Sequence, residues 1–341
     1  MSIKLPISKS IANRVLILQA LRGENLLTMP AQAPRDVVVL KEALEALNSP
    51  IPPKTIYVGN CGTAMRFLTA YCAQLQGCKV ILDGSPRMRK RPIGQLVDGL
   101  AKCGADIWYM NELGYPPLRV TGSKLCFVKH KVDRTKYPLN NPDSSQFVSA
   151  MLLVGLPVES NSKSPYITMT QKLLKQDTSL MTLDNIERDW SSAAFWYEYV
   201  ALHGGELDLE GLQQETLQGD IMVADIFRQL GVETTFTETG IQIRRAGKVK
   251  KLMVLNFSEC PDLYPAVAVT CRQVGVKLFA RGTDALKIKE SDRLQAVKEY
   301  KTYGDHRIAM ALLAAGLECD NKECINKSYP TFYEQLCQLQ S

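Results

Sequence analysis

Histidine is scarce in this sequence, and its cysteines are not spaced as metal ligands. Only three histidines occur among the 341 residues, and none of the ten cysteines belongs to a CxxC pair. Structural zinc sites require such clustered ligands. We therefore expect no metal centre, and the cysteines are typical of reduced thiols buried in a cytosolic protein.

Long apolar runs and extended blocks of like charge are also missing. The longest apolar runs, Ser149–Val158 and Ile308–Leu317, are too short to cross a bilayer, and the first residues contain no signal-peptide core. The net charge of +6 is modest, and the densest basic cluster, Arg87–Arg91, lacks the interleaved aromatic residues of a nucleic-acid surface. We expect a soluble cytoplasmic protein that binds neither nucleic acid nor membrane, and small anionic substrates would suit its charge.

The sequence does contain alternating helix and strand patterns on a scale of about two domains. Apolar spacing over Ser10–Leu21 predicts a helix with one buried face. The alternation favours an α/β or α+β fold over a helix bundle or a sandwich, and a domain junction is expected near Asp184–Glu187. The other predicted elements are a strand at Ile56–Val58, a helix at Thr63–Gln74, a strand at Lys79–Leu82 and a helix at Ile93–Cys103. The same alternation of strand and helix is predicted over Leu183–Leu202 and Val254–Val274. A strand-like run ends at the expected junction.

Positive side chains recur beside glycines, hydroxyls or capping residues where helices are predicted to begin. Free N–H groups at a helix start attract anions, and glycine lets the backbone approach a phosphate closely. Each such segment taken alone is equally typical of an ordinary cap or a solvated basic loop. Together they indicate one site for two anionic ligands. The segments are Ser8–Arg14, Gly59–Arg66, Arg87–Pro92, Asp143–Phe147, Lys289–Arg293 and Gly304–Arg307.

Carboxylates accompany the cations in the C-terminal half of the chain. Asp262 follows the apolar run Leu252–Phe257, and the last two basic segments each combine acidic residues with arginine. Such groupings suit acid–base chemistry beside an anion, although surface ion pairs would show the same pattern.

These segments resemble the 5-enolpyruvylshikimate-3-phosphate synthase family. The matches follow the family order over nearly the whole chain. They include GNCGTAMR at 59–66, RPIGQLVDGL at 91–100, KESDR at 289–293 and DHRIAM at 305–310.

The resemblance implies a two-domain α/β (α+β) fold of the enolpyruvyl transferase type. It is an inside-out α/β barrel of repeated βαβαββ units, with helices inside and sheets outside. Residues 8–186 would form one domain, which carries the helix starts that bind shikimate 3-phosphate. Residues 1–7 and 187–341 would form the second domain, which carries the acid–base and phosphoenolpyruvate-binding residues.

The implied reaction transfers the enolpyruvyl group of phosphoenolpyruvate to the 5-hydroxyl of shikimate 3-phosphate. A tetrahedral ketal phosphate forms by addition, and phosphate leaves by elimination. The reaction needs a base for the hydroxyl, an acid for the methylene carbon and cations for both ligands. It needs no metal or redox cofactor, and we expect the protein to act as a monomer.

The resemblance also implies which residues act. Asp262 would be the base, Glu290 would transfer a proton to the methylene carbon, and Lys9 would reach both ligands as a third catalytic residue. The residues implied for shikimate 3-phosphate are Lys9, Ser10, Arg14, Ser144, Ser145, Gln146, Asp262 and Lys289. The residues implied for phosphoenolpyruvate are Lys9, Gly62, Arg91, Gln146, Arg293, Arg307 and Lys327.

The sequence departs from the family pattern at two substrate contacts. Ala285 stands four positions before Lys289, where the family usually has a polar residue, so one hydroxyl contact is lost. The segment Ser162–Ser164 covers the place of a family serine, and which of its three residues meets the phosphate stays open.

The chain is also shorter than the family. Few residues precede Lys9, which leaves little room for a strand. Tyr300 and Lys301 are adjacent where the family has the remainder of a helix and further strands.

Two other functions remain possible at this stage. A related enolpyruvyl transferase that acts on a UDP-sugar uses a reactive loop cysteine, and Cys61 lies in a glycine turn. The Arg91–Ile93 and Ser144–Gln146 segments fit the shikimate enzyme better. A non-catalytic ligand-binding relative would be compatible with the shortness of the chain and with Ala285.

Overall fold

The computed structural model describes residues 1–30, 32–125, 136–182 and 185–340, and it divides into two compact units. The domain limits expected from the sequence stay a prediction, and the expected junction begins at a residue outside the described part. In that part, no helix is long and apolar enough to cross a membrane. Unit 1 comprises Met1–Lys9, Met29–Arg35 and Asp184–Ser341, and unit 2 comprises Ser10–Thr28 and Asp36–Leu183.

The described residues of unit 2 form a four-stranded sheet, a two-stranded sheet and six helices, the first two of which begin at the unit boundary. Its elements are α1 (Lys9–Arg22), α2 (Arg35–Leu47), β2 (Thr55–Tyr57), α3 (Gly62–Gln74), β3 (Lys79–Asp83), α4 (Gly94–Lys102), β4 (Asp106–Tyr109), β5 (Leu118–Thr121), β6 (Tyr137–Pro138), α5 (Ser145–Leu153), β7 (Val158–Glu159) and α6 (Pro165–Leu173).

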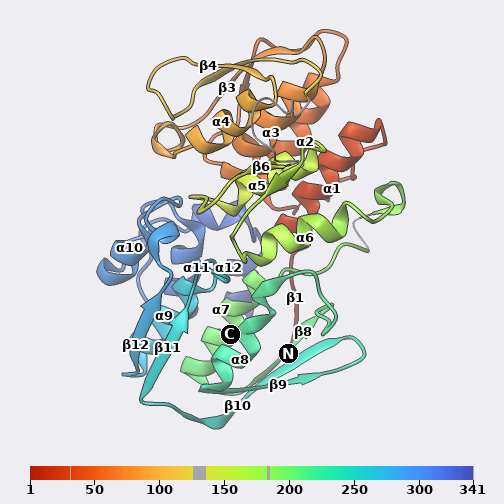
Figure 1. Ribbon diagram of the computed structural model, residues 1–341. Helices are drawn as coiled ribbons and strands as arrows, with labels where there is room; N and C mark the ends of the chain where they lie inside the picture. The colour runs from red at the N-terminus through yellow and green to blue at the C-terminus, as the bar shows by residue number, and fades with distance from the viewer. Residues whose placement is uncertain (31, 126–135, 183–184, 341) are drawn as a thin grey trace. The chain divides into compact units, whose positions relative to one another are not determined.

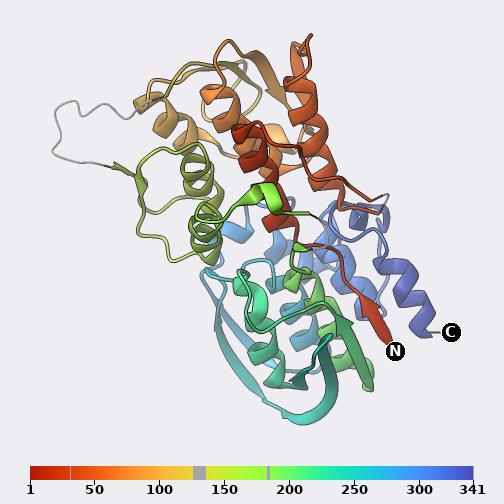
Figure 2. The ribbon, with the colours of Figure 1, turned by 90° about the vertical axis from the view of Figure 1, so that its right-hand side faces the viewer.

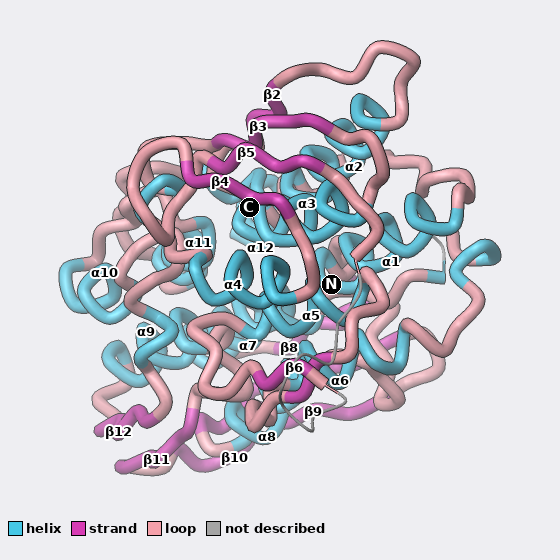
Figure 3. The backbone as a smooth tube through the Cα atoms, turned by 45° about the horizontal axis from the view of Figure 1, so that its top comes forward, coloured by secondary structure: helices cyan, strands magenta, loops and turns pink. Residues whose placement is uncertain are grey.

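The four strands of unit 2 form one layer in the order β2-β3-β5-β4, and this layer lies over α3 and α4 (Figure 3). β2 and β3 are parallel, whereas β5 is antiparallel to β3 and β4. Along β5, Leu118 and Val120 are buried, whereas Arg119 between them is exposed. One face of the sheet therefore packs on the helices while the other faces solvent.

Helix α1 is buried more completely than its sequence pattern predicts. The residues Ile11–Gln19 are all buried, including Asn13 and Arg14. The expected single apolar face is therefore wrong, because the helix lies inside unit 2 and not on its surface. Its polar side chains find acceptors in the protein, such as Thr170 Oγ1, which lies 2.7 Å from Arg14 Nε.

In its described residues, unit 1 contains a four-stranded sheet in the order β1-β8-β10-β9, a two-stranded parallel sheet and six helices that lie wholly within the unit. Its elements are β1 (Ser2–Lys4), α7 (Trp190–His203), β8 (Glu206–Glu210), α8 (Val223–Arg228), β9 (Leu230–Phe236), β10 (Gly240–Val249), β11 (Leu252–Asn256), α9 (Tyr264–Gln273), β12 (Lys277–Arg281), α10 (Arg293–Glu299), α11 (His306–Ala314) and α12 (Phe332–Gln340).

The core of unit 1 lies between its two sheets. Figure 1 shows α7 and α8 against the four-stranded sheet and α9 beside β11 and β12. Helix α7 packs against α8, α9 and α11, and its residues from Trp190 to Glu198 are all buried. Helices therefore fill the interior of this unit, and sheets form its outer layers.

A strand forms at the N-terminus, contrary to the expectation that the short stretch before Lys9 leaves little room for one. β1 pairs in parallel with β8, with Ile3 opposite Leu209. The chain end is fixed further by α12, because Gln335 Nε2 donates a hydrogen bond of 3.0 Å to the Lys4 carbonyl. Figure 2 shows the N-terminal strand and the C-terminal helix ending near one another. Burial of Ile3 and Leu5 explains why so short a segment is ordered as a strand.

Most other predicted elements are confirmed within one or two residues, including α3, β3 and α4, and the alternation predicted over Val254–Val274 is present as β11 and α9. The strand-like run before Glu187 is not confirmed where it is described, because Asn185 and Ile186 belong to no strand. Instead, Arg188 forms an isolated antiparallel bridge with Ile7. The turn between α10 and α11 is tight. Tyr300 adopts a left-handed conformation with φ of 54°, and its N–H donates to the Ala296 carbonyl.

Glu198 is a buried acidic residue in the core of unit 1. Its side chain is fully buried on α7, and within the described residues neither carboxylate oxygen has a hydrogen-bond partner. Burial raises the pKa of Glu198 well above its usual value, and its charge acts on Cys271 of α9. Because the pKa of Glu198 is higher in the folded than in the unfolded protein, its proton contributes to the free energy of unfolding. This contribution is complete below about pH 4.5 and decreases as the pH rises toward the pKa of the folded protein.

We expect Glu198→Met to stabilise the protein by about 2–4 kcal/mol at pH 8 and by less at pH 5, because an apolar side chain of similar length needs no proton in the core. Urea unfolding of both proteins between pH 5 and pH 8 measures this difference. Glu318→Met, at an exposed position of the same unit, is the matched control. A Glu198→Met gain that is equal at all pH values would contradict a protonated core carboxyl.

Candidate active site

Aspartates place the acidic and basic side chains of unit 1 at the starts of its helices. The Asp292 carboxylate caps α10, so Arg293 becomes its first residue. The Asp305 carboxylate caps α11 by accepting a hydrogen bond of 3.0 Å from the Arg307 N–H. Asp262 lies in the turn between β11 and α9. N-caps of this kind are local properties of the sequence, and here they place two arginines in the first turn of their helices.

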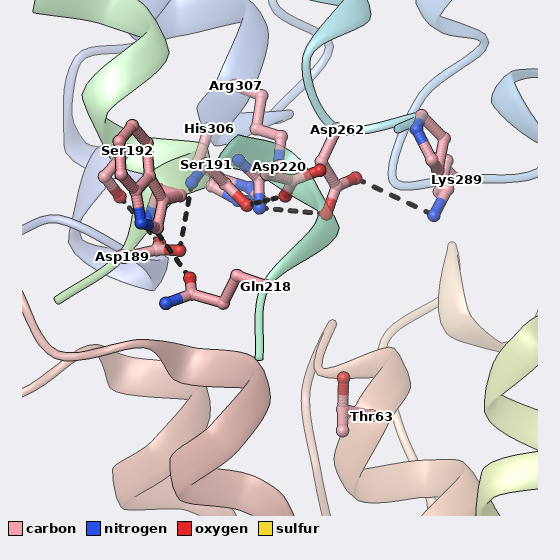
Figure 4. Close-up of polar contacts among 12 residues, drawn as sticks. Thr63, Asp189, Ser191, Ser192, Gln218, Asp220, Asp262, Lys289, His306 and Arg307 are labelled. Carbon is pink, nitrogen blue, oxygen red and sulfur yellow. Dashed lines mark hydrogen bonds and ion pairs between the residues drawn. The ribbon is translucent and has the colours of Figure 1, made fainter. Parts of the chain in front are cut away.

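Asp262 is the centre of a group of cations (Figure 4). Its Oδ1 lies 2.8 Å from Arg293 Nη1 and 3.8 Å from Lys289 Nζ, and its Oδ2 lies 2.9 Å from Arg307 Nη2. Burial opposes the ionisation of Asp262, but the charges of Arg307, Lys289 and Arg293 together outweigh it and hold its pKa well below the usual value. In the structure, Asp262 is therefore a carboxylate whose basicity is reduced by its partners.

Glu290 joins the same network through a second pair of cations. Its Oε1 lies 2.6 Å from Lys327 Nζ, and its Oε2 lies 3.4 Å from Arg293 Nη2. Arg293 also places Nε 2.8 Å from Asp305 Oδ2, so one guanidinium bridges three carboxylates. Burial opposes its charge, but Asp305, Asp262 and Glu290 outweigh this effect and raise its pKa. Arg293 is 1% exposed, so it is fixed in place by these three partners.

Lys9 belongs to this group by its electrostatic effects. Burial raises the pKa of Asp189, and the charges of Arg307 and Lys9 oppose this rise. The charge of Lys9 also contributes to a lowered pKa of His306. Burial is the main reason why the pKa of His306 falls well below its usual value, and Lys327 and Arg307 add to it. The imidazole is therefore neutral near pH 7. Unit 1 thus brings together seven of the residues predicted from the sequence: Lys9, Asp262, Lys289, Glu290, Arg293, Arg307 and Lys327.

Three acidic or polar residues of this region were missed by the prediction from the sequence. Asp189 caps α7 and accepts a hydrogen bond of 2.8 Å from Ser192 Oγ. Asp220 accepts a short hydrogen bond from the Ser191 hydroxyl. Gln218 Oε1 accepts a hydrogen bond of 3.1 Å from the Trp190 N–H. Asp189 could have been found from the sequence, because it is an aspartate directly before a predicted helix, as Asp305 is.

Unit 2 places the predicted residues Gly62 and Arg91 side by side. Gly62 is the first residue of α3, and a Cβ atom built on it would lie 2.6 Å from Arg91 Nη1 and 2.5 Å from Arg66 Nη1. Such distances are too short for any side chain unless the arginines move. The two arginines can approach this position so closely because residue 62 has no Cβ atom.

The start of α5 lies close to the start of α3 in the same unit. Gln146 Nε2 donates a hydrogen bond of 2.9 Å to Thr63 Oγ1, and the Ser144 hydroxyl caps α5 by accepting from the Gln146 N–H. Ser145 is the first residue of α5. The predicted Ser-Ser-Gln segment and the glycine turn therefore share one region of unit 2.

Arg14 and Ser10 are connected within α1. The Arg14 Nη1 donates a hydrogen bond of 2.8 Å to the Ser10 carbonyl, while Nη2 lies 3.2 Å from Ser149 Oγ. Burial lowers the pKa of Arg14 to about 10, yet the side chain stays charged at neutral pH. The guanidinium is therefore engaged by protein acceptors, and its contact with a substrate stays a prediction. The same holds for Ser162–Ser164, where the Ser164 N–H donates to Ser162 Oγ.

The described residues contain no group of three or more histidine, cysteine, aspartate or glutamate side chains placed to hold a metal ion. The cysteines in this part of the chain are all free thiols. The carboxylates, lysines and arginines around Asp262 can provide charge pairing and proton transfer.

Comparison with known proteins identifies relatives along most of the chain. The family model described as EPSP synthase (3-phosphoshikimate 1-carboxyvinyltransferase) matches residues 27–300 and 297–336. A 3-phosphoshikimate 1-carboxyvinyltransferase of Bacteroides fragilis strain YCH46 is 33% identical over 400 aligned positions, which cover 98% of this chain and 94% of that protein. A protein of the same description from Colwellia psychrerythraea is 28% identical, with 98% and 96% covered.

A solved EPSP synthase structure from Acinetobacter baumannii has the same fold. It superposes with a TM-score of 0.68 at 20% identity and covers 99% of this chain and 95% of that one. The predicted fold class, a two-domain inside-out α/β arrangement of the enolpyruvyl transferase type, is confirmed. The described strands form open sheets that do not close into a barrel.

The comparisons also bear on the shortness of the chain. The alignment with the Bacteroides protein needs 400 positions although this chain has 341 residues, so the relative contains segments that this chain lacks. The family match divides at residues 297–300, where α10 ends and the tight turn at Tyr300 leads to α11. This is the place where the sequence predicted that family strands are missing.

Proposed function

Because this chain belongs to the EPSP synthase family, we propose that it transfers the enolpyruvyl group of phosphoenolpyruvate to the 5-hydroxyl of shikimate 3-phosphate and releases phosphate. The observation that carries the proposal is the family match along nearly the whole chain. The carboxylate–cation network around Asp262 supports it, because the reaction needs both proton transfer and anion binding.

The proposed acid–base residues are Asp262 and Glu290, with Lys9 close to both ligands. Asp262 takes the proton of the 5-hydroxyl, whose oxygen then attacks C2 of phosphoenolpyruvate. Glu290 gives a proton to the methylene carbon, and a tetrahedral ketal phosphate results. Loss of a proton from the new methyl group and departure of phosphate complete the reaction.

The cations proposed to hold phosphoenolpyruvate are paired with the proposed acid–base groups in the structure. Arg307 and Arg293 contact Asp262, and Lys327 contacts Glu290. A bound phosphate or carboxylate would compete for these cations and so loosen their hold on Asp262 and Glu290. Binding of the anion would therefore make Asp262 more basic, which is required before it can accept a proton.

The remaining substrate contacts are proposed for unit 2 and for Lys289. Gly62, Arg91 and Gln146 would bind phosphoenolpyruvate together with Arg293, Arg307 and Lys327. Ser10, Arg14, Ser144, Ser145, Gln146 and Lys289 would bind shikimate 3-phosphate together with Lys9 and Asp262.

We expect Gly62→Ala to raise the KM for phosphoenolpyruvate by about 10- to 100-fold, since the new methyl group displaces Arg91 and a charge-assisted bond contributes about 1.5–3 kcal/mol. The KM for shikimate 3-phosphate should change much less. Gly94→Ala is the matched control, because a Cβ atom there meets nothing closer than 3.5 Å. Equal changes in both KM values would argue against Arg91 as a phosphoenolpyruvate ligand.

The reaction itself is tested by a phosphate-release assay. Purified full-length protein is incubated with shikimate 3-phosphate and phosphoenolpyruvate, and the product is identified by mass spectrometry. Phosphate release that depends on both substrates is expected. Binding of shikimate 3-phosphate without turnover would instead support a non-catalytic relative.

No observation favours the UDP-sugar enolpyruvyl transferase. That alternative needs a reactive loop cysteine, but Cys61 is 2% exposed. Its sulfur caps α3 by accepting from the Ala64 N–H and contacts the Asp36 carbonyl. Cys61 therefore has a structural position at the start of a helix.

We also propose that the protein works as a cytoplasmic monomer without nucleic-acid or membrane partners. The modest net charge of +6 and the lack of a long basic block support the absence of a nucleic-acid partner. Size-exclusion chromatography with light scattering tests the oligomeric state, and a mass near 38.0 kDa is expected.

A further inference from the structure

A second carboxylate lies beside Asp262 in the interior of unit 1. Asp220 is 3% exposed and belongs to a 3₁₀ turn, Gly219–Met222. Its Oδ2 accepts a short hydrogen bond from the Ser191 hydroxyl at the start of α7. Figure 4 shows the Asp220 carboxyl group between Ser191 and Asp262, with Arg307 close to both aspartates.

Arg307 interacts electrostatically with both Asp220 and Asp262. Arg307 Nη2 contacts Asp262 Oδ2 directly at 2.9 Å, and its charge also acts on Asp220. The two carboxylates act on each other as like charges. A negative charge on Asp220 therefore weakens the hold of Arg307 on Asp262 and also disfavours the negative charge of Asp262. Both effects make Asp262 a stronger base.

We propose that Asp220 is a positioning residue of the reaction, which acts through Arg307 and sets the basicity of Asp262. The inference rests on the proposed function, because it takes Asp262 as the base for the 5-hydroxyl.

The surroundings of Asp220 determine when it carries charge. Burial, followed by the charge of Asp262, raises the pKa of Asp220 to about 6, against the opposing effects of Ser191 and Arg307. Asp189, at the start of α7, raises the pKa of Asp220 further when it is ionised, although burial raises the pKa of Asp189 itself. Cys260, in the loop before α9, also faces Asp220, but burial raises its pKa to about 12, so the thiol is neutral at pH 5–8.

The expected pH dependence follows from these groups. Below about pH 6, Asp220 is protonated, and Arg307 is held by Asp262 with no competing charge. Above about pH 6, Asp220 is ionised, and Asp262 is the better base. The wild-type kcat should rise between pH 5 and pH 7.5 with a midpoint near 6.

The test compares kcat for phosphate release from pH 5 to pH 8 in the full-length wild type and three variants. Asp220→Asn should remove the rise and lower kcat at pH 7.5 by up to about tenfold, the effect of one pKa unit in the base. Ser191→Ala should move the midpoint to higher pH, because it removes a hydrogen bond that favours the ionised Asp220. Asp225→Asn, whose side chain is 73% exposed on α8, is the control and should match the wild type.

A second measurement needs no substrate. Because the pKa of Asp220 is raised in the folded protein, its proton contributes to the free energy of unfolding. This contribution is complete below about pH 4 and is lost as the pH rises through about 6. In urea unfolding, the decrease in the free energy of unfolding with rising pH should be smaller in Asp220→Asn than in the wild type, and the part that remains includes the contribution of Glu198. The measurement also reports whether the variant folds, and Ser191→Ala tests the same group if it does not.

The outcomes separate the inference from the proposed function. Wild-type protein that releases no phosphate at any pH would overturn the proposed function, while the unfolding measurement would still report the proton on Asp220. Active protein in which Asp220→Asn keeps the wild-type pH profile, or in which Ser191→Ala leaves the midpoint in place, would overturn the role of Asp220.

Discussion

Replacing Asp262 by alanine is expected to lower kcat for phosphate release by about 10²–10⁴-fold, the usual contribution of one general base. Binding of shikimate 3-phosphate, measured by calorimetry, should persist because most of its proposed cationic ligands remain. The pKa of Asp262 lies well below its usual value because the charges of Arg307, Lys289 and Arg293 outweigh the effect of burial. Loss of activity at acidic pH is therefore not expected to come from protonation of Asp262 itself.

The alanine variant also changes the network around Asp262. It leaves the buried guanidinium groups of Arg293 and Arg307 without one carboxylate, which typically costs about 3–5 kcal/mol of folding stability. Asp262→Asn keeps one side-chain oxygen, which can accept from only one of the two arginines, so it removes the base while it retains part of the network. Both variants should lose turnover, and the alanine variant should lose more stability in urea unfolding.

A control for charge alone is available on the same unit. Asp284→Asn removes a carboxylate whose side chain is 98% exposed and should leave kcat unchanged. Turnover of Asp262→Asn at the wild-type rate would remove Asp262 from the mechanism.

Replacing Glu290 by glutamine is expected to lower kcat by a similar factor of about 10²–10⁴, because the amide cannot give a proton to the methylene carbon. Its oxygen can still accept a hydrogen bond from Lys327 Nζ, which lies 2.6 Å from the carboxylate. The KM for phosphoenolpyruvate should therefore change far less than kcat, a split that indicates a group used only in the chemical step.

Solvent-exchange kinetics provide a direct readout of this proton transfer. Incubation in deuterium oxide should label the methylene group of the product in the wild type and only slowly in Glu290→Gln. The exposed substitution Glu318→Gln is the control. Labelling at the wild-type rate in Glu290→Gln would assign the proton transfer to another group.

Much of the local structure could be predicted from the sequence. Helix α3 follows a glycine turn, α4 begins shortly after Pro92, and the aspartates at 292 and 305 cap their helices as short-range rules require. These features depend on neighbours within a few residues of the chain.

Burial of whole helices could not be predicted in the same way. Helix α1 contains Asn13, Arg14 and Gln19, which read as a polar face, yet all three are buried. Arg14 is accommodated by Thr170 and Ser149, which are 156 and 135 residues away in the sequence. Acceptors so distant leave no trace in the periodicity of the helix itself.

The sequence by itself determined which charged side chains stand at the starts of helices, because caps and free N–H groups act within one turn of the chain. Only the tertiary structure decided which carboxylate faces which cation, such as Asp262 with Arg293 and Arg307, or Asp220 with Ser191. Coulomb energy and the cost of burial depend on separation and solvent exposure in space. Asp220 and Glu198 therefore became visible as unusual acids only once their surroundings were known.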